Sequence, residues 1–125
     1  MIVGVGCDVF AVARLERDLR RDPSGLPAQL FTVRETERCG AGPHHGRHYA
    51  LRFAGKEAVF KALGLTEGDT ASFHEVEILD RTGGGHEAVL HGRLQERAGR
   101  LGVRRIHLTL AATRELATAF AVAET

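Results

Sequence analysis

Two carboxylates and one lysine in this sequence are of the types that bind a phosphorylated substrate together with a divalent cation. Asp8 follows a short apolar run at the N-terminus, and Glu57 and Lys61 stand four residues apart in a predicted helix. Two carboxylates can hold a hard octahedral cation such as Mg²⁺, which takes its other ligands from water and phosphate. A lysine one helical turn after Glu57 can neutralise charge on that phosphate. The hypothesis requires the fold to bring Asp8 to Glu57.

Each of these residues also has a purely structural interpretation. An aspartate between a strand and a helix is a common N-cap, because its carboxylate accepts a backbone N–H and interacts favourably with the helix dipole. Glu57 and Lys61 could form an exposed i, i+4 ion pair, which contributes about 0.3–0.5 kcal/mol. Taken one by one, the three residues fit these structural interpretations better than a phosphate site, and only their combination favours the site.

The lysines are distributed unusually. Lys56 and Lys61 are the only two lysines in the chain, which has seventeen Lys and Arg residues in total. Arginine and lysine are not equivalent, since the ammonium group is a compact point charge and the guanidinium group is a planar fork. Two lysines in one helix of an arginine-rich protein therefore indicate positions where the compact ammonium is wanted.

The element after Asp8 is predicted to be an amphipathic helix with one basic side. Its apolar stripe has the i, i+3, i+7 spacing and consists of Val12, Leu15 and Leu19. Arg14, Arg17 and Arg21 repeat that spacing on the other side of the helix. Taken by itself, this basic ridge is interpreted as a solvated arginine face.

The remaining elements alternate between strand and helix without a strict βαβ order, so the predicted class is α+β with a small, mostly antiparallel sheet. Glycine at position 64, in a left-handed conformation, is expected to end the long helix. The first predicted elements are a strand over 2–7, a loop through 22–27, a capped helix over 33–39 and a long helix from 47 or 48 to 63. The core face of the long helix is predicted to consist of Tyr49, Phe53, Phe60 and Leu63. The later elements are a polar turn over 65–72, strands over 73–79 and 87–90 joined by Gly83–85, a helix over 92–101, and strands around 106–110 and 116–123.

Length and composition limit the class of protein. The chain of 125 residues predicts a single domain over 1–125. Cys7 and Cys39 have no CxxC spacing, which is typical of a reduced cytoplasmic protein. A net charge of +1 argues against bulk nucleic-acid binding, and the N-terminal apolar run is too short for a signal peptide or a membrane span.

Several motifs together resemble one family. They are the opening IVGVGCD over 2–8, the RLE element at 14–16, the FTxxE cap at 31–35, the helix RFAGKEAVFKALG over 52–64 and the HLT strand at 107–109. In this order they resemble holo-(acyl carrier protein) synthases, the short single-domain branch of the 4′-phosphopantetheinyl transferases. The helix motif is specific, whereas the opening motif is weak by itself.

The resemblance implies that the chain transfers phosphopantetheine from coenzyme A to a serine of an apo acyl or polyketide carrier protein and releases adenosine 3′,5′-bisphosphate. It implies that Asp8 and Glu57 bind Mg²⁺ with the pyrophosphate of coenzyme A. Glu57, directly or through a water held by the metal, would help to deprotonate the serine, and Lys61 would stabilise charge on the pyrophosphate. The other implied coenzyme A contacts are Gly64, His107, Thr109 and Lys56.

The resemblance further implies a homotrimer with active sites between subunits, in which His107 and Thr109 serve a neighbouring subunit. Arg14 and Arg21 match positions that contact the carrier protein in the family, and the helical spacing adds Arg17 to that surface. The chain departs from the family at Ala111 and Ala112, where a hydroxyl residue and a second histidine are usual. The alternative function is therefore a non-catalytic paralogue that binds carrier proteins with the same fold.

Overall fold

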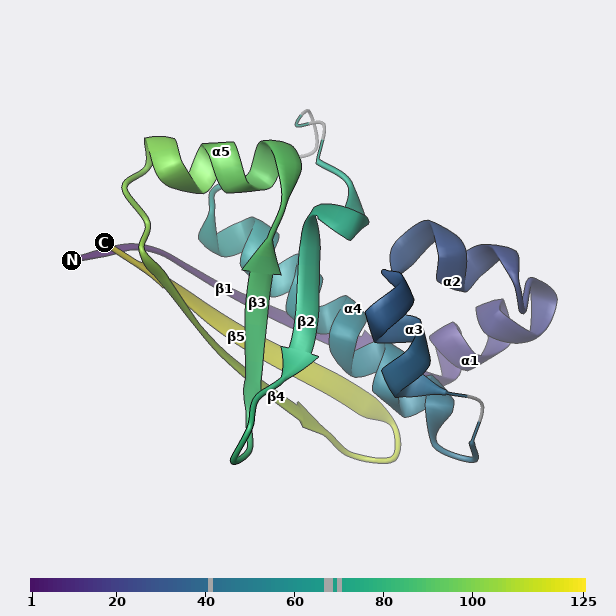
Figure 1. Cartoon of the computed structure of the whole chain (residues 1–125). Helices are drawn as coiled ribbons and strands as arrows, with labels where there is room; N and C mark the ends of the chain where they lie inside the picture. The colour runs from purple at the N-terminus through teal and green to yellow at the C-terminus, as the bar shows by residue number, and fades with distance from the viewer. Residues whose placement is uncertain (41, 67–68, 70) are drawn as a thin grey trace.

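A computed structural model describes residues 1–40, 42–66, 69 and 71–125, and it confirms the α+β class. Figure 1 shows a long helix lying against one face of an antiparallel sheet, with short helices at one end and a separate hairpin beside it. The sheet has the order β1-β5-β4, and the hairpin is β2-β3. The elements are β1 (Ile2–Ala11), α1 (Val12–Arg21), α2 (Gly25–Leu30), α3 (Val33–Cys39), α4 (His45–Ala62), the 3-10 turn η1 (Phe73–Glu75), β2 (Val76–Asp80), β3 (His86–Leu90), α5 (Gly92–Arg100), β4 (Arg105–Ala112) and β5 (Leu116–Glu124).

Small residues bring the long helix α4 unusually close to the sheet. The helix presents Ala54, Ala58 and Ala62 at every fourth position, and all three are buried. Every second residue of β5 from Ala117 to Ala123 is also a buried alanine. Because neither surface carries bulky side chains, the two backbones can approach closely. The apolar face predicted for α4 is correct at Tyr49 and Leu63, which are buried, whereas Phe53 and Phe60 are only half-buried.

The helices before α4 differ from the prediction in one element. The segment over 22–27 is predicted as a loop, but α2 begins at Gly25. The carboxylate of Asp22 accepts the N–H of Gly25 at 3.0 Å, and Pro27 lies in the first turn, where its missing N–H costs nothing. Proline and glycine in this stretch thus start a helix rather than prevent one. The α1 stripe of Val12, Leu15 and Leu19 is buried as predicted.

The predicted cap of α3 is confirmed. The Thr32 side chain accepts the N–H of Glu35, and the Glu35 carboxylate accepts the N–H of Thr32 at 2.9 Å. Glu35 is fully buried, and its second carboxylate oxygen accepts the N–H of Ile78 at 2.9 Å. This glutamate therefore links α3 to the hairpin as well as capping its own helix.

Other boundaries shift by a few residues. α4 begins at His45, two residues before the predicted start, and β1 extends to Ala11 rather than ending at Cys7. Residues 73–75 form a 3-10 turn instead of strand because the Ser72 hydroxyl accepts the N–H of His74 at 3.2 Å. The polar turn predicted over 65–72 includes 67, 68 and 70, which lie outside the described residues. Within the described part of the chain, no helix is both long enough and apolar enough to cross a membrane.

The hairpin is fixed to α3 by the nearly buried Glu77 of β2. Its carboxylate accepts hydrogen bonds from the Thr32 hydroxyl at 2.6 Å and from the Arg34 guanidinium, and the His91 ring lies 3.2 Å away. Burial by itself would raise the pKa of Glu77, but the hydrogen bonds from Arg34, Thr32 and His91 outweigh burial and lower the pKa to about 2.

This shift predicts an acid-dependent loss of stability. Because the carboxylate has a lower pKa in the folded chain than in the unfolded chain, its contribution is complete above about pH 5 and is lost as pH falls towards 2. A shift of this size contributes roughly 3 kcal/mol to the free energy of unfolding. Denaturant titrations at pH 7, 4 and 2.5 should show that Glu77→Gln is less stable than the wild type at pH 7 and that the difference shrinks at low pH. A difference that does not change with pH would contradict the assignment.

Candidate active site

Two glycines of β1 direct Asp8 towards helix α4. A Cβ atom at Gly4 would lie 2.0 Å from the carbonyl oxygen of Ala62, and one at Gly6 would lie 2.0 Å from that of Ala58. Only glycine permits this close approach of strand to helix. Side chains alternate along a strand, so Asp8 points to the same face of the sheet as Gly4 and Gly6. Asp8, the next residue on this face of the strand after Gly6, therefore faces α4.

Asp8 meets Lys61 on that face. The Lys61 ammonium donates to the Asp8 carboxylate at 3.2 Å and to the carbonyl oxygen of Cys7 at 2.9 Å. The N-cap interpretation of Asp8 is wrong, because Asp8 lies inside β1 opposite Ala119 and the cap position of α1 is Ala11. The ion pairs of the described residues join Lys61 to Asp8 and not to Glu57, its i−4 neighbour.

Glu57 completes the group. This glutamate is half-buried on α4, and burial raises its pKa, as does the negative charge of Asp8, while Lys61 opposes the shift. Asp8 therefore lies near enough to Glu57 for its charge to act on the Glu57 carboxyl group. The tertiary structure thus brings together Asp8, Glu57 and Lys61, which are up to 53 positions apart along the chain.

Beside these residues lies a pocket of about 400 Å³. Phe73 forms part of its aromatic side, since its ring lies 5.4 Å from the ring of Phe53 and 5.4 Å from that of Phe60. The pocket therefore has an acidic and basic edge next to an apolar wall, as a ligand with a charged part and an uncharged part requires. The lining residues are Glu57, Phe60, Lys61, Leu65, Thr66, Asp69, Ala71 and Phe73.

Lys56 is not part of this pocket. Its side chain is fully buried, and its ammonium donates to Glu35 at 2.7 Å and to the carbonyl oxygens of Phe73 at 2.7 Å and Val76 at 2.6 Å. Burial lowers the pKa of Lys56, and the charge of Glu35 opposes the shift. Three protein oxygens already accept from the ammonium, and no part of the side chain reaches solvent. The prediction that Lys56 contacts coenzyme A is therefore corrected, because in this structure Lys56 holds the core together instead.

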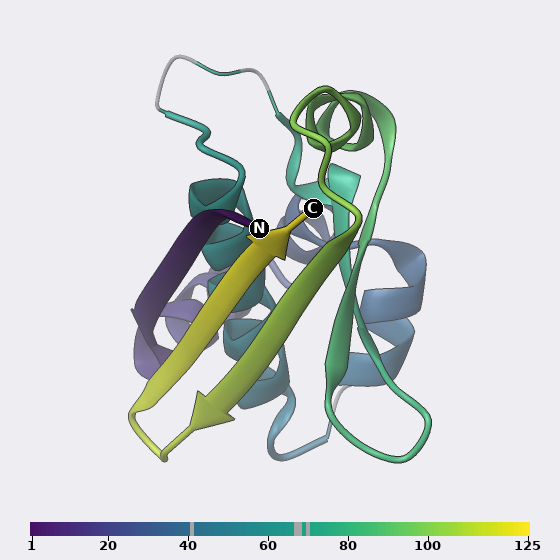
Figure 2. The ribbon, with the colours of Figure 1, turned by 90° about the vertical axis from the view of Figure 1, so that its left-hand side faces the viewer.

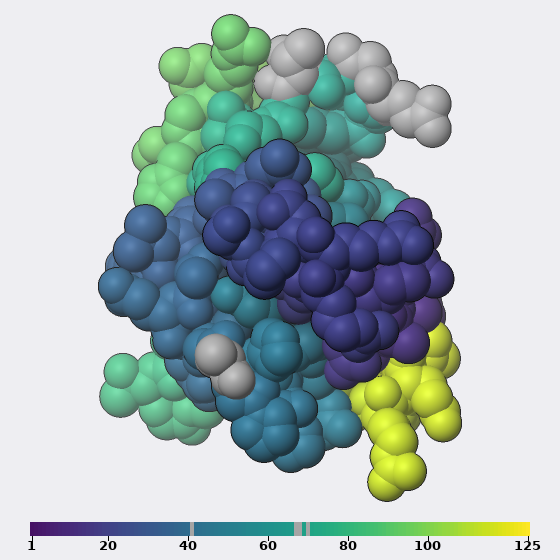
Figure 3. Space-filling model, turned by 90° about the vertical axis from the view of Figure 1, so that its right-hand side faces the viewer, coloured from purple at the N-terminus to yellow at the C-terminus, as the bar shows by residue number. Residues whose placement is uncertain are grey.

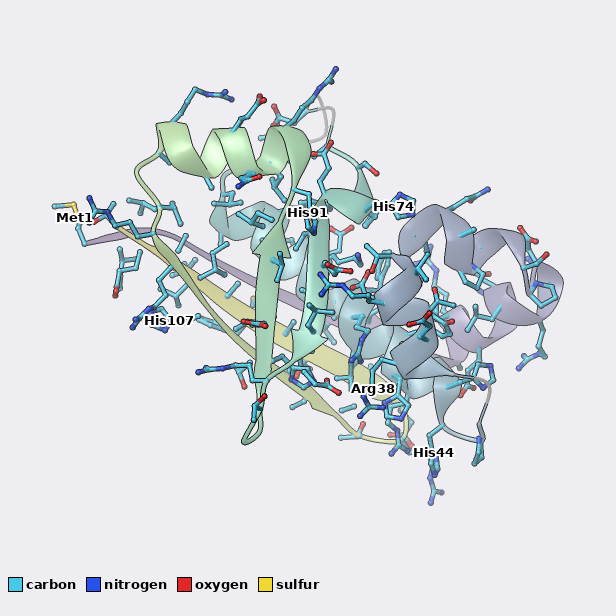
Figure 4. The ribbon with its side chains drawn as sticks, in the orientation of Figure 1. Met1, Arg38, His44, His74, His91 and His107 are labelled. Atoms are coloured by element: carbon cyan, nitrogen blue, oxygen red, sulfur yellow. The ribbon has the colours of Figure 1, made fainter. Side chains whose placement is uncertain are left out.

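His107 and Thr109 lie on the opposite face of the sheet. Both are exposed on β4, and they alternate with Leu108 and Leu110, which are partly buried and pack against the core. Figure 4 shows His107 on this outer side of the strand. The structure therefore does not bring either residue to Asp8 and Glu57 of the same chain.

Gly64 has the predicted left-handed conformation, with φ of 70°, two residues after the end of α4. Its carbonyl oxygen accepts from Arg97 at 2.8 Å. Ala111 and Ala112 lie at the end of β4, where they pair with Thr118 and Ala117 of β5. Their small side chains leave the strand pairing intact.

The carboxylates fit a hard cation. Among the described residues no group of three or more His, Cys, Asp or Glu side chains is gathered as a complete metal cage. Glu57 instead lines the pocket, and Asp8 lies beside it through its ion pair with Lys61; burial first, and the charge of Asp8 second, raise the pKa of Glu57, a strain that a cation between the carboxylates would relieve. Mg²⁺ is usually bound in this way, with one or two carboxylates and with substrate phosphate and water as the other ligands.

Comparison with known proteins identifies the family. The family model of the 4′-phosphopantetheinyl transferase superfamily matches residues 4–121. The chain belongs to this superfamily. The matched residues include Asp8, Glu57 and Lys61.

Individual relatives are similar to this chain over nearly its whole length. A holo-[acyl-carrier-protein] synthase of Geobacter metallireducens is 35% identical over 99% of this chain and 98% of its own length. The crystal structure of the synthase from Neisseria meningitidis has a TM-score of 0.90 and 26% identity, with complete coverage of both chains. The synthase of Bacillus anthracis, solved in complex with CoA (3′,5′-ADP), has a TM-score of 0.81 and 27% identity over 100% of this chain and 98% of that one.

Two features of the site were not predicted from the sequence. Phe73 is predicted as part of a strand, and no local pattern places its ring against Phe53 and Phe60. Gly4 and Gly6 carry a usable signal, because two glycines at alternate positions of a strand indicate a close approach of another backbone on that face.

Proposed function

We propose that this protein is a holo-(acyl carrier protein) synthase, which transfers the 4′-phosphopantetheine group of coenzyme A to a serine of an apo carrier protein. The observation that carries the proposal is the convergence of Asp8, Glu57 and Lys61 beside one pocket in a chain of this superfamily. The relatives named synthases and the relative solved with coenzyme A support both substrates. The carrier belongs to fatty acid or polyketide synthesis.

The reaction is a phosphoryl transfer to the serine hydroxyl of the carrier protein. The serine hydroxyl oxygen forms a bond to the phosphorus that carries the pantetheine arm, the bond from this phosphorus to the bridging oxygen breaks, and adenosine 3′,5′-bisphosphate leaves. Glu57 accepts the serine proton at its carboxylate. Glu57 lines the pocket, so its carboxylate can reach a serine hydroxyl bound there.

Lys61 stabilises the charge that develops on the pyrophosphate. The ammonium is half-exposed, so it can reach a ligand while its present partners, Asp8 and the carbonyl of Cys7, hold it at the pocket edge. Asp8 and Glu57 would hold Mg²⁺. When bound, the cation supplies a Lewis-acid centre that neutralises charge on the phosphate oxygens. Positioning and charge neutralisation are the main requirements of phosphoryl transfer.

The carrier protein is expected to dock on helix α1. Arg14, Arg17 and Arg21 are all exposed there, and the Arg14 guanidinium lies 5.6 Å above the ring of Phe10. Figure 3 views the molecule from the side on which α1 and α2 lie, where the N-terminal segments form a continuous raised surface. β1 runs directly into α1, so this surface is joined to the strand that carries Asp8. An acidic carrier bound to the ridge therefore approaches the pocket.

Charge reversal on this ridge should affect one substrate selectively. Arg14→Glu is expected to raise the KM for the carrier by about tenfold or more, since it replaces an attraction to an acidic surface by a repulsion. The KM for coenzyme A should change by less than about twofold, because Arg14 lies outside the pocket. Steady-state kinetics with each substrate varied in turn measures both constants. Equal increases in the two constants would argue against α1 as the docking surface.

We further propose a homotrimer formed through the open face of the sheet. Figure 2 shows β1, β5 and β4 facing the viewer with the helices behind them. Large apolar side chains are exposed on this face, including Val5 at 56%, Val9 at 61% and Phe120 at 48%. His107 and Thr109 lie on the same face, which supports a role in the site of a neighbouring subunit. Light scattering tests the proposal, because a molar mass of one chain would contradict it.

One experiment tests the main proposal. The protein is incubated with coenzyme A, Mg²⁺ and an apo carrier protein, and the carrier is then weighed by mass spectrometry. A gain equal to one phosphopantetheine group is expected, and it should disappear when a chelator removes the cation. If several carriers bind but gain no mass, the chain is the non-catalytic paralogue, and the enzyme assignment is wrong. We place the protein in the cytoplasm, which the free thiols of Cys7 and Cys39 support.

A further inference from the structure

Arg97 of helix α5 contacts the end of helix α4 in a way that its position in the sequence does not indicate. Its guanidinium donates to the carbonyl oxygens of Leu63 at 2.7 Å and Gly64 at 2.8 Å. The last carbonyl groups of a helix have no partner within the helix and carry partial negative charge. One planar fork therefore satisfies the carbonyl of the C-cap residue Leu63 and that of the next residue, Gly64, from a helix that lies 33 or 34 residues further along the chain.

The same guanidinium holds the segment that follows α4 at a second point. Its Nη1 atom lies 3.8 Å from the carboxylate of Asp69. That carboxylate in turn accepts the N–H of Thr66 at 2.6 Å and the Thr66 hydroxyl at 3.2 Å. Arg97 thus contacts the segment at residues 63–64 and at Asp69, on both sides of Thr66.

Three described residues after α4 line two pockets. Leu65, Asp69 and Ala71 line both the pocket beside Glu57 and Lys61 and a smaller pocket of about 140 Å³ over α5. Arg97 lines only the smaller pocket. Arg97 thus contacts Asp69, which lines both pockets, without lining the pocket beside Glu57 itself.

We propose that Arg97 is a positioning residue of the transferase, which fixes the residues after α4 that line the pocket beside Glu57 and Lys61 and thereby the binding of coenzyme A. Arg97 acts through the backbone of residues 63–66 and does not touch the reacting atoms. Lys61 also lies in the last turn of α4, and its carbonyl oxygen accepts the N–H of Gly64 at 3.0 Å. Loosening the end of this helix therefore displaces both these lining residues and the lysine. The inference rests on the proposed transferase function.

The test compares Arg97→Ala and Arg97→Lys with Arg100→Ala. Arg100 is exposed on the same helix and lines the same small pocket, so it is a matched control for loss of positive charge. Arg97→Ala is expected to raise the KM for coenzyme A by about tenfold or more, since small displacements of positioning groups have large kinetic effects. The KM for the carrier and the KM values of Arg100→Ala should stay within about twofold of the wild type.

Arg97→Lys separates positioning from simple charge attraction. Lysine keeps the positive charge, but a single ammonium cannot reproduce the planar fork between two carbonyl oxygens. It should therefore restore less than half of the lost affinity for coenzyme A. Full restoration by lysine, or an unchanged KM for coenzyme A in a folded Arg97→Ala protein, would overturn the inference.

A measurement on the ligand-free protein supplements the kinetics. The amides of Gly64 and Leu65 donate to the carbonyl oxygens of Lys61 and Phe60, so their hydrogen exchange reports on the end of α4. Exchange at these two amides should be about tenfold faster in Arg97→Ala than in Arg100→Ala. Unchanged exchange would contradict the proposal even if the protein had no transferase activity. Conversely, a wild type without activity would refute the proposed function and leave the exchange result interpretable.

Discussion

Glu57→Gln should reduce phosphopantetheine transfer by about 10³-fold or more, because the substitution removes both a carboxylate ligand for the cation and the proton acceptor for the serine. Asp8→Asn should reduce transfer by a similar factor, because it removes a carboxylate ligand of the cation but not the proton acceptor. In the structure Glu57 lines the pocket, Asp8 pairs with Lys61 at its edge, and each amide keeps the shape of the side chain that it replaces. Mass spectrometry of the carrier over a time course measures the rates.

The stability of Glu57→Gln should be equal to or higher than that of the wild type at neutral pH. Burial and the Asp8 charge raise the pKa of Glu57 above its value in the unfolded chain, so the ionised carboxylate destabilises the fold. Glutamine removes this repulsion. The combination of lower activity with unchanged or higher stability is typical of an active-site group.

Glu96→Gln is the matched control, because Glu96 is an exposed glutamate on α5. Its transfer rate and unfolding midpoint should equal those of the wild type. Activity of Glu57→Gln within about tenfold of the wild type would contradict the assigned base, since loss of a general base removes at least about 10²-fold. Asp8→Asn should in addition need a higher Mg²⁺ concentration for half-maximal rate.

Lys56→Met should lower the free energy of unfolding by about 3–5 kcal/mol, which is the range for removing one partner of a buried ion pair. The substitution would leave the fully buried carboxylate of Glu35 without its cation, and the carbonyl oxygens of Phe73 and Val76 without a donor. Urea denaturation measures the change as a lower midpoint.

Lys61→Met is the matched comparison, because these are the two lysines of the chain and they lie in the same helix. The Lys61 side chain is 50% exposed, so its loss should change the free energy of unfolding by less than about 1 kcal/mol. Transfer should nevertheless fall strongly. A Lys56→Met protein with a wild-type midpoint and a raised KM for coenzyme A would show that Lys56 faces the substrate after all. If Lys56→Met does not fold, the milder Lys56→Arg should still have a reduced midpoint.

The sequence by itself identified the chemistry and most of the elements. Residue types that bind metal and phosphate at Asp8, Glu57 and Lys61 are visible without a structure, as are the capping box at Thr32 and Glu35 and the left-handed Gly64. These features depend on local spacing or on the conformational preferences of single residues. Local rules failed at α2, where proline in the first turn of a helix resembles the proline of a loop.

Only the tertiary structure decided which lysine serves the pocket. Lys56 and Lys61 lie five positions apart, about 140° around the helix at 100° per residue, so one enters the core and the other reaches the pocket edge. Their surroundings consist of Glu35, Phe73 and Val76 for one and of Cys7 and Asp8 for the other. All of these partners are distant in sequence.

The position of Asp8 has the same origin. The close approach of β1 to α4, which Gly4 and Gly6 permit, turns this carboxylate towards Glu57. Arg97 likewise reaches the end of α4 only because α5 folds back over it. Sequence therefore determined which groups are present, and the long-range packing of strand and helix determined which of them meet, since even the signal of Gly4 and Gly6 indicates a close approach without naming the partner.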